Sequence, residues 1–158
     1  MPPARRYGVG GAVKEIHIGR HHNNALQIEV DASTADSVDA YVRYWPDSAG
    51  EAAALSSPSS PKGLEHRMVL LNLVPGTKYS YQVVAGGVAT KTYGFASPVL
   101  PMWLQEQFKY SSDSLALIPQ VFKEGFMLLN KRETPGVDYI VDYKGRIRWY
   151  HEAGRDGF

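Results

Sequence analysis

Apolar and polar residues alternate along short segments of the chain between Val13 and Ser97, and turn-forming residues separate these segments. A period of two places one face of a segment in a core and the other in solvent, as in a β-strand. In one segment, for example, this alternation puts Val38 and Val42 on the face opposite to Asp39. Strands at this spacing, without helical periodicity, predict a β-sandwich for residues 1–97. The alternating segments are 13–18, 26–30, 38–45, 66–70, 79–84 and 89–95.

Two stretches predict how these strands are connected. The pair Gly86-Gly87 is typical of a tight hairpin. Residues 56–63 are rich in Pro and Ser, which predicts a polar loop at the surface. The strand after that loop opens with His66 beside Glu65, and we expect the His66 ring to be solvated.

A second pattern begins at Pro98 and predicts a separate unit, residues 98–158. Residues 101–108 fit a short helix or an apolar strap, and residues 111–114 fit a loop. The apolar run from Gly125 to Asn130 predicts a buried strand.

A hairpin is predicted next, with strands at 138–142 and 146–150. Its turn contains Asp142 and Gly145. The Asp142 carboxylate can accept hydrogen bonds from the turn amides, and Gly145 can adopt a positive φ.

Composition excludes several classes of function. The 158 residues include 17 basic and 16 acidic ones without a long basic run, so we expect no nucleic acid as a partner. There is no cysteine, which excludes disulfides, thiolate metal sites and a cysteine nucleophile. The first residues do not resemble a signal peptide, and no apolar run reaches the length of a membrane span.

The histidines predict no catalytic site. We expect His17 to be half-exposed on a strand and His151 to lie at the end of one. His21 and His22 are adjacent, so on a strand they point to opposite faces, although a turn could let both converge on a metal.

The carboxylates also lack a catalytic arrangement. Asp36 and Asp39 lie around a turn, Glu124 precedes a glycine, and the hairpin explains Asp142. There is no glycine-rich phosphate loop and no HExxH motif. We therefore predict no catalytic, cofactor-binding or metal-binding residue in this chain, and no cofactor.

The segment from Leu73 to Tyr81, LVPGTKYSY, resembles the crossover between two strands of fibronectin type III domains. In such a crossover, Leu73 would seal the core and Pro75-Gly76 would turn the chain. Tyr79 would form a tyrosine corner, with its hydroxyl bonded to the backbone upstream. Purple acid phosphatases also open with a sandwich of this kind, but their metal-binding motifs are absent here.

The second unit resembles the opening blade of bacterial aryl-sulfate sulfotransferases. The resemblance rests on the strand GFMLLN, on Pro135-Gly136, and on the hairpin YIVDYKGRIRWY that ends at Tyr150. Members are β-propellers behind a small β-sandwich, the order found in this chain. Other propellers, including quinoprotein-like repeats, share the D-x-x-G turn and stay open as an alternative.

This resemblance implies a function for the whole enzyme. A histidine in the propeller channel takes a sulfuryl group from an aryl sulfate and passes it to a phenol. That histidine would lie on later blades, so residues 1–158 form a docking or dimerising region that we expect to be inactive alone. The alternative is a non-enzymatic module that binds a protein or glycan through loops such as 46–63.

The resemblance also implies partners and a compartment: the remaining blades or another copy of the chain, in a periplasmic or secreted protein. A blade without neighbours would expose five apolar residues, at a cost of several kcal/mol. We therefore expect the second unit to pack on the sandwich, on a second copy or on another fragment. The five residues are Phe126, Leu128, Ile140, Ile147 and Trp149.

Overall fold

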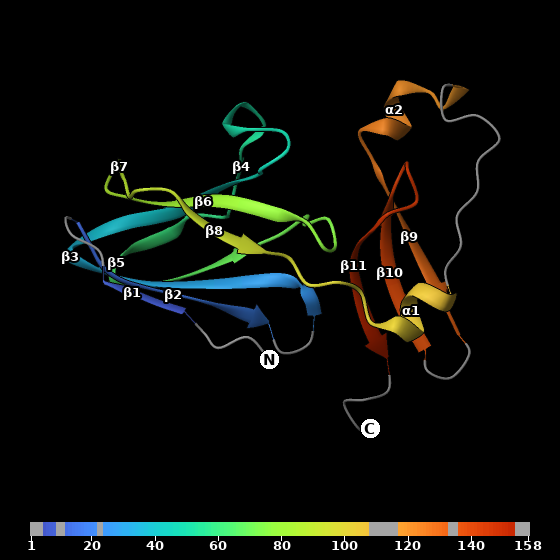
Figure 1. The fold of residues 1–158 in the computed structure, drawn as a ribbon, viewed down its shortest axis with the longest axis horizontal. Helices are drawn as coiled ribbons and strands as arrows, with labels where there is room; N and C mark the ends of the chain where they lie inside the picture. The colour runs from blue at the N-terminus through green and yellow to red at the C-terminus, as the bar shows by residue number, and fades with distance from the viewer. Residues whose placement is uncertain (1–4, 9–11, 22–23, 108–116, 133–135, 154–158) are drawn as a thin grey trace.

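The computed structural model describes residues 5–8, 12–21, 24–107, 117–132 and 136–153, and it confirms the all-β prediction. Its strands form two antiparallel sheets, one of eight strands and one of three (Figure 1). The first sheet contains β1 (Arg5–Gly8), β2 (Val13–His21), β3 (Asn24–Pro46), β4 (Leu55–Ser56), β5 (Ser60–Leu70), β6 (Lys78–Ala85), β7 (Val88–Ala89) and β8 (Tyr93–Ala96). The second contains β9 (Phe126–Lys131), β10 (Gly136–Asp142) and β11 (Ile147–Ala153).

Strand β3 links the two layers of the first sheet. The sequence predicted separate strands at 26–30 and 38–45, but the structure has one strand of 23 residues. Its first half pairs with β2 and β5, and its second half pairs with β6. The register with β5 is irregular between Ser33 and Val38, where the strand passes from one layer to the other. A sheet that is folded into two layers in this way fits a β-sandwich.

The core lies between these two layers. The alternation predicted for 38–45 holds, because Ala40, Val42 and Tyr44 are buried in the core. Trp45, on the opposite face, is buried as well. The other layer contributes Ile16, Ile28, Val30, Met68 and Leu70.

The connection before β6 has the geometry predicted for a tyrosine corner. The Tyr79 hydroxyl accepts a hydrogen bond of 2.9 Å from the Val74 amide. Leu73 is fully buried, and Gly76 turns the chain at a φ of 63°. Tyr79 stacks on Phe95 of β8, with 5.3 Å between the ring centroids.

The hairpin between β6 and β7 also follows the prediction. Gly86 and Gly87 have φ values of 55° and 80°, the left-handed region that suits glycine. The first pair beyond the turn joins Ala85 to Val88.

The loop predicted for 56–63 is shorter than expected. Strand β5 already begins at Ser60, and both Ser57 and Ser60 are buried. The Ser57 hydroxyl accepts a hydrogen bond of 3.0 Å from the Val42 amide, which ties the segment to β3. Before it, a short 3-10 helix, η1 (Glu51–Ala53), lies in the connection that rises above the layers (Figure 1).

The second unit contains the predicted hairpin, formed by β10 and β11. Within the stretch for which a helix or strap was predicted, the structure has the helix α1 (Met102–Gln107), and a further helix, α2 (Gln120–Lys123), precedes β9. The loop expected at 111–114 lies outside the described residues. None of the helices in the described parts is long and apolar enough to span a membrane.

Strand β9 differs from its prediction. The run from Gly125 to Asn130 was expected to be buried, but Phe126 is 53% exposed and Leu128 is 69% exposed. The reason is that none of the described elements covers this face of the second sheet, in which β9 pairs, among the described strands, with β10 alone.

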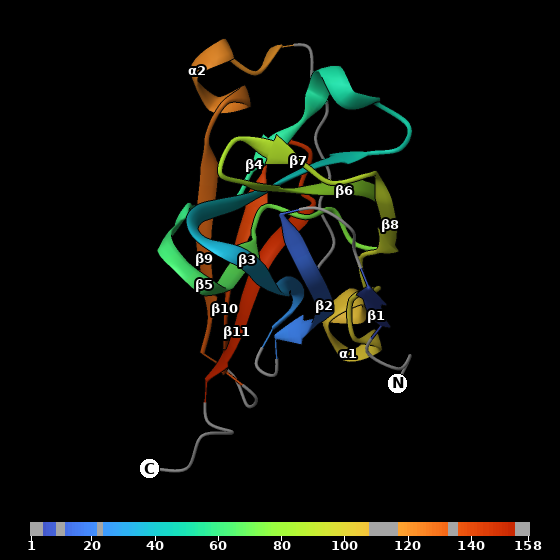
Figure 2. The same ribbon diagram turned by 90° about the vertical axis from the view of Figure 1, so that its left-hand side faces the viewer.

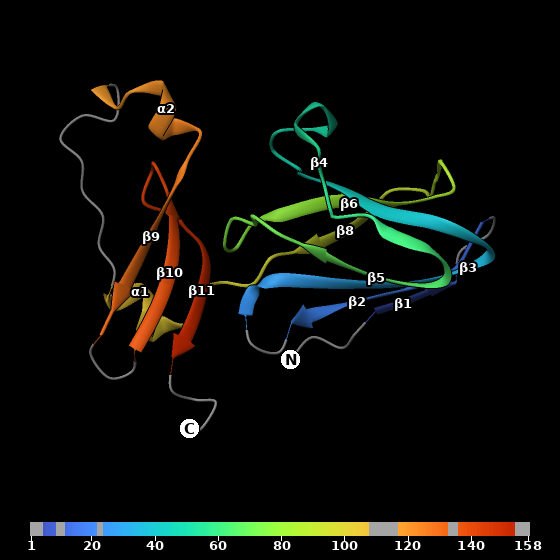
Figure 3. The ribbon, with the colours of Figure 1, turned by 180° about the vertical axis from the view of Figure 1, so that it is seen from behind.

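The second sheet packs against one end of the two layers formed by the first sheet. The strands of the second sheet run across the end of the two-layer part, at a steep angle to its strands (Figures 1 and 2). Strand β11 lies nearest the first sheet and β9 lies farthest from it (Figure 3). The division of the chain into two domains at residue 97 stays a prediction. The two parts share side chains, because Leu26 of the first part is buried in the core of the second.

Candidate functional site

The two histidines of β2 that the structure describes, His17 and His21, each lie near a single carboxylate. His17 is half-exposed as predicted, and its Nδ1 is 4.0 Å from Asp31. The Nε2 of His21 is 3.8 Å from Glu29, while His22 lies outside the described residues. Across the described residues, no three histidine or acidic side chains converge in a way that could hold a metal ion.

The prediction for His66 is wrong. Its side chain is buried, at 3% exposure, rather than solvated. The two ring nitrogens lie 3.1 Å from the Ser60 hydroxyl and 3.4 Å from the Thr34 hydroxyl. This contact joins β5 to the bend of β3, and it gives His66 a structural role.

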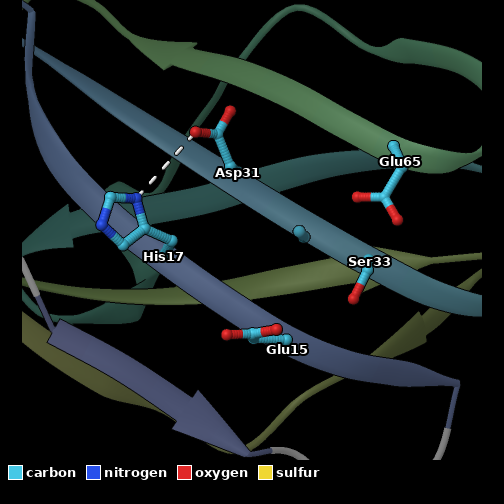
Figure 4. Close-up of a pocket in the computed structure, with 6 residues that line it drawn as sticks. Glu15, His17, Asp31, Ser33 and Glu65 are labelled. Carbon is cyan, nitrogen blue, oxygen red and sulfur yellow. Dashed lines mark ion pairs between the residues drawn. The ribbon is translucent and has the colours of Figure 1, made fainter.

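A shallow polar depression lies on the solvent-facing side of β2, β3 and β5 in the first sheet (Figure 4). It has a volume of about 290 Å³ and is open to solvent. Arg67 binds Asp31 beside it at 2.9 Å. The side chains shown in Figure 4 point away from the sheet without a common focus, so the depression has the features of a solvated sheet face. Its lining residues are Glu15, His17, Asp31, Ala32, Ser33 and Glu65.

A denser polar cluster lies where the two sheets meet, around Asp142. One carboxylate oxygen of Asp142 accepts hydrogen bonds of 3.0 Å from the Lys144 and Arg146 amides, as the turn chemistry predicted. The other oxygen binds the guanidinium groups of Arg146 at 2.8 Å and Arg148 at 3.0 Å. Arg148 also donates a 2.6 Å hydrogen bond to the Asn72 carbonyl of the first sheet's β5–β6 connection.

This cluster changes the acidity of Asp142. Burial alone would raise the pKa of its carboxyl group, because it disfavours the charged form. The hydrogen bonds from the Arg146 amide and guanidinium, the Arg146 charge and the Lys144 amide outweigh the burial. The pKa of Asp142 is therefore held below its usual value, and the carboxylate stays charged as a structural anchor.

A second contact between the sheets comes from the start of β3. The Asn24 side chain donates a 2.7 Å hydrogen bond to the Tyr150 carbonyl and accepts one of 2.9 Å from the Leu26 amide. Leu26 is buried in the second core together with Ile147. Ile147 is one of the five residues that a blade without neighbours would expose, and here it is buried because it packs with Leu26 of the first sheet. Of the three alternatives expected for the second unit, these contacts show packing on the first sheet.

The second sheet has one covered face and one apolar face without a covering element. On the covered face, Leu129 and Tyr139 pack with Leu104 of α1. On the opposite face, the strand pairing places Leu128 beside Ile140 and Ile140 beside Trp149. Cross-strand partners point to the same side, so these three side chains form a row, which Phe126 extends. We call Phe126, Leu128, Ile140 and Trp149 the outer face.

Helix α1 packs on the covered face, and in Figure 3 it lies behind the second sheet, with none of the described helices and strands drawn in front of that sheet. Polar side chains flank the apolar row: Asn130 donates a 2.6 Å hydrogen bond to Asp138, and His151 stacks on Trp149 at 6.2 Å. An apolar strip with a polar margin is typical of an interaction surface rather than of a catalytic pocket.

Sequence reasoning missed the residues that join the sheets. Asn24 and Asn72 follow no motif, and their partners lie 126 and 76 residues away. The sequence held a weak signal for a turn at Asn72. Among the described non-glycine residues, Asn72 has a positive φ, of 58°. An asparagine next to Leu73 at the end of a strand is compatible with such a turn.

Comparisons with known proteins leave the family open. No protein-family model matches the chain, and no curated protein matches it. Among solved structures, the sensor domain of the anti-sigma factor RsgI4 in Pseudobacteroides cellulosolvens is similar, with a TM-score of 0.43 and 15% identity. The similarity covers 58% of this chain and 99% of that one. A likeness this weak supports no conclusion about the function of this chain.

Proposed function

We propose that this chain is the N-terminal docking region of an enzyme like the aryl-sulfate sulfotransferases. In this proposal, residues 1–97 form a fibronectin-like sandwich and residues 98–158 contribute the opening strands of a β-propeller. A histidine on a later blade would take the sulfuryl group from an aryl sulfate and transfer it to a phenol. The enzyme would be periplasmic or secreted.

The outer face carries this proposal. In this row Phe126 and Leu128 are exposed and Ile140 and Trp149 are half-buried, and such apolar surface costs free energy unless another surface covers it. Packing of two sheets face to face is the usual way to bury such a row, and propeller blades pack in this way. The Asp142–Gly145 turn and the order of the two units are consistent with the same proposal.

The docking surface would also be held in a fixed orientation. Arg148 and Asn24 tie the second sheet to the first at two points, and Leu26 fills the core between them. A sandwich fixed in this way could orient the first blade for the blades that follow it.

Activity measurements test the proposal. The natural polypeptide that contains this region should transfer sulfate from 4-nitrophenyl sulfate to a second phenol, measured as release of 4-nitrophenol. The present chain alone should release none above the uncatalysed rate. Turnover by residues 1–158 alone, or none by the natural polypeptide, would contradict the proposal.

A binding assay tests the surface itself. Leu128→Ser in the outer face should weaken association with the separately expressed remainder of the polypeptide. The matched control is Val88→Ser on β7, which removes an apolar side chain of similar exposure, 60% against 69%. Equal effects of the two substitutions would count against docking through the outer face.

A second candidate function is binding of a protein or glycan by the connection between β3 and β5. The favouring observation is that the part of this connection around η1 rises above both layers (Figure 1). Arg43 fixes it through a 3.1 Å ion pair with Glu51. A glycan array or a pull-down that compares the chain with Glu51→Ala would test this function.

A further inference from the structure

A pocket with an apolar lining lies at one end of the second sheet. Helix α2 lies at the end where β10 turns into β11 (Figures 1 and 3). The pocket has a volume of about 240 Å³ and is partly enclosed. A cavity of about 150 Å³ already holds a benzene ring, so this pocket has room for one large side chain. Its lining residues are Ile118, Phe122, Gly125, Phe126, Met127 and Tyr143.

Three aromatic residues from three elements line the pocket. Phe122 belongs to α2, Phe126 begins β9, and Tyr143 belongs to the turn between β10 and β11. Met127 adds a thioether, which packs favourably against aromatic rings. Aromatic rings also pack well against further rings, in edge-to-face or offset arrangements. The lining therefore favours an aromatic ring as the occupant.

Helix α2 packs on no core of its own. None of its four residues is buried, and Val121 and Phe122 are 72% and 63% exposed. Of the twelve exposed large apolar residues in the described parts of the chain, six lie between Leu117 and Leu128. Apolar side chains gathered in this way are typical of a surface that another surface covers.

The pocket is continuous with the outer face through Phe126. Phe126 lines the pocket, and it also extends the apolar row that contains Leu128. A surface that covers the outer face therefore also reaches the pocket. The exposed Lys144 ammonium lies 5.5 Å from the centroid of the Tyr143 ring, so a polar group borders the apolar lining.

From this continuity we propose that the surface that docks on the outer face inserts one aromatic side chain into the pocket. The inference rests on the docking part of the proposed function, in which that surface belongs to the remainder of the natural polypeptide. An aromatic side chain seated in a desolvated pocket is a typical anchor of an interface and accounts for a large share of its affinity. The anchor would fix where along the apolar row the docking surface sits.

Labelling of cysteine variants tests whether the pocket is covered, because residues 1–158 contain no cysteine. Phe122→Cys should react with iodoacetamide at least about tenfold more slowly in the natural polypeptide than in residues 1–158 alone, followed by mass spectrometry of the labelled peptide. Val88→Cys is the matched control, with 60% exposure against 63%, and should react equally in both. Protection of Leu128→Cys without protection of Phe122→Cys would overturn the pocket contact and leave the docking proposal intact. If neither variant is protected, both proposals fail.

Gly125 offers a variant that fills the pocket. A Cβ atom at Gly125 would lie 3.6 Å from the nearest atom, the Val121 carbonyl oxygen, which is an ordinary contact. In the natural polypeptide, Gly125→Leu should raise the labelling rate of Leu128→Cys about tenfold, because the anchor can no longer enter. The control Gly19→Leu, where the nearest atom is 3.9 Å away, should leave that rate unchanged. Equal rates in the two double variants would overturn the proposal.

Small probes test the preference for an aromatic ring. Indole at about 1 mM, a concentration suited to weak binding, should shift the amide NMR signals of Gly125 and Met127 in residues 1–158. The aliphatic probe 3-methylbutanol should shift them less, since it lacks a ring that can pack against the lining. Gly125→Leu should remove the shifts caused by indole. Equal shifts with the two probes, or none with indole, would overturn an aromatic occupant.

Discussion

The Asp142 carboxylate is the residue whose charge matters most to the contact between the sheets. It binds Arg146 and Arg148 with one oxygen and two backbone amides with the other. Arg148 in turn reaches the Asn72 carbonyl. A single ionised group therefore orders both its own turn and the long-range link.

The low pKa of Asp142 predicts a dependence of stability on pH. In the unfolded chain the carboxyl should titrate near its ordinary pKa of about 3.9, and in the folded chain below that value. The unfolded state then binds more protons in this window, so the Asp142 contribution is complete above about pH 4–5 and is lost as pH falls through the folded pKa.

Urea denaturation between pH 7 and pH 3 measures this contribution. Asp142→Asn should lower the free energy of unfolding at pH 7 by about 1–3 kcal/mol, because charged hydrogen bonds are lost. The variant should also lose less stability on acidification than the parent chain does. Parallel pH profiles for the two proteins would show that Asp142 is not the group responsible.

Tyr79 has a separate and local role. Its hydroxyl is the acceptor for the Val74 amide at 2.9 Å. Tyr79→Phe should destabilise the chain by about 1–3 kcal/mol, since the partly buried amide loses its partner. Tyr41→Phe, on the half-buried outward face of β3, should change stability by less than about 0.5 kcal/mol. Chemical denaturation of both variants checks the difference, and equal effects would contradict it.

Among the elements, the hairpin between β6 and β7 has two neighbouring glycines with a positive φ. Substituting each by alanine separates two contributions to the loss of stability, a steric clash and an unfavourable backbone conformation. Gly86 and Gly87 both lie in the left-handed region, at 55° and 80°. A Cβ atom at Gly86 would lie 3.0 Å from the Cγ1 atom of Val38, whereas none of the described atoms lies within 4 Å of one at Gly87.

Alanine substitutions at the two positions should therefore differ. Gly87→Ala should cost about 1 kcal/mol for its backbone conformation alone. Gly86→Ala should cost about 1–3 kcal/mol, because Val38 must also shift. Thermal unfolding followed by circular dichroism measures both. A lower melting temperature for Gly87→Ala than for Gly86→Ala would contradict the clash.

At the scale of the whole molecule, Leu26 joins two cores. It belongs to β3 of the first sheet, yet its side chain is buried with Val137, Val141 and Ile147 of the second. Truncation of Leu26 should thus loosen a sheet whose strands begin 100 residues later in the chain.

Hydrogen exchange tests this coupling. Leu26→Ala should cost about 2–5 kcal/mol, and the amides of β10 and β11 should exchange faster. The matched variant is Leu70→Ala in the first core, which should affect β3 and β5 first. Unchanged protection of β10 and β11 in Leu26→Ala would show that the second sheet is held by other contacts.

Features that depend on near neighbours in the chain could be predicted from the residue pattern. Alternation fixed which side of each strand is buried at Val42 and Tyr44, and the turn residues fixed the Gly86-Gly87 and Asp142–Gly145 hairpins. The tyrosine corner at Tyr79 was also predictable, because donor and acceptor lie five residues apart. Local conformational preference and short-range hydrogen bonds decide such features, so a pattern of a few residues contains the information.

Which side chains are buried could not be predicted in this way, because burial depends on contacts between distant parts of the chain. An apolar run such as that of β9 becomes a buried or an exposed strand according to its neighbours, and Leu128 is exposed because none of the described elements covers its face of the sheet. His66 is buried where Thr34 of β3, 32 residues away in the chain, meets its ring beside Ser60 of the same strand. Arg148 joins the sheets through a carbonyl 76 residues away. Burial and long-range pairing depend on which surfaces meet in space, and the spacing of residues along one chain does not specify that.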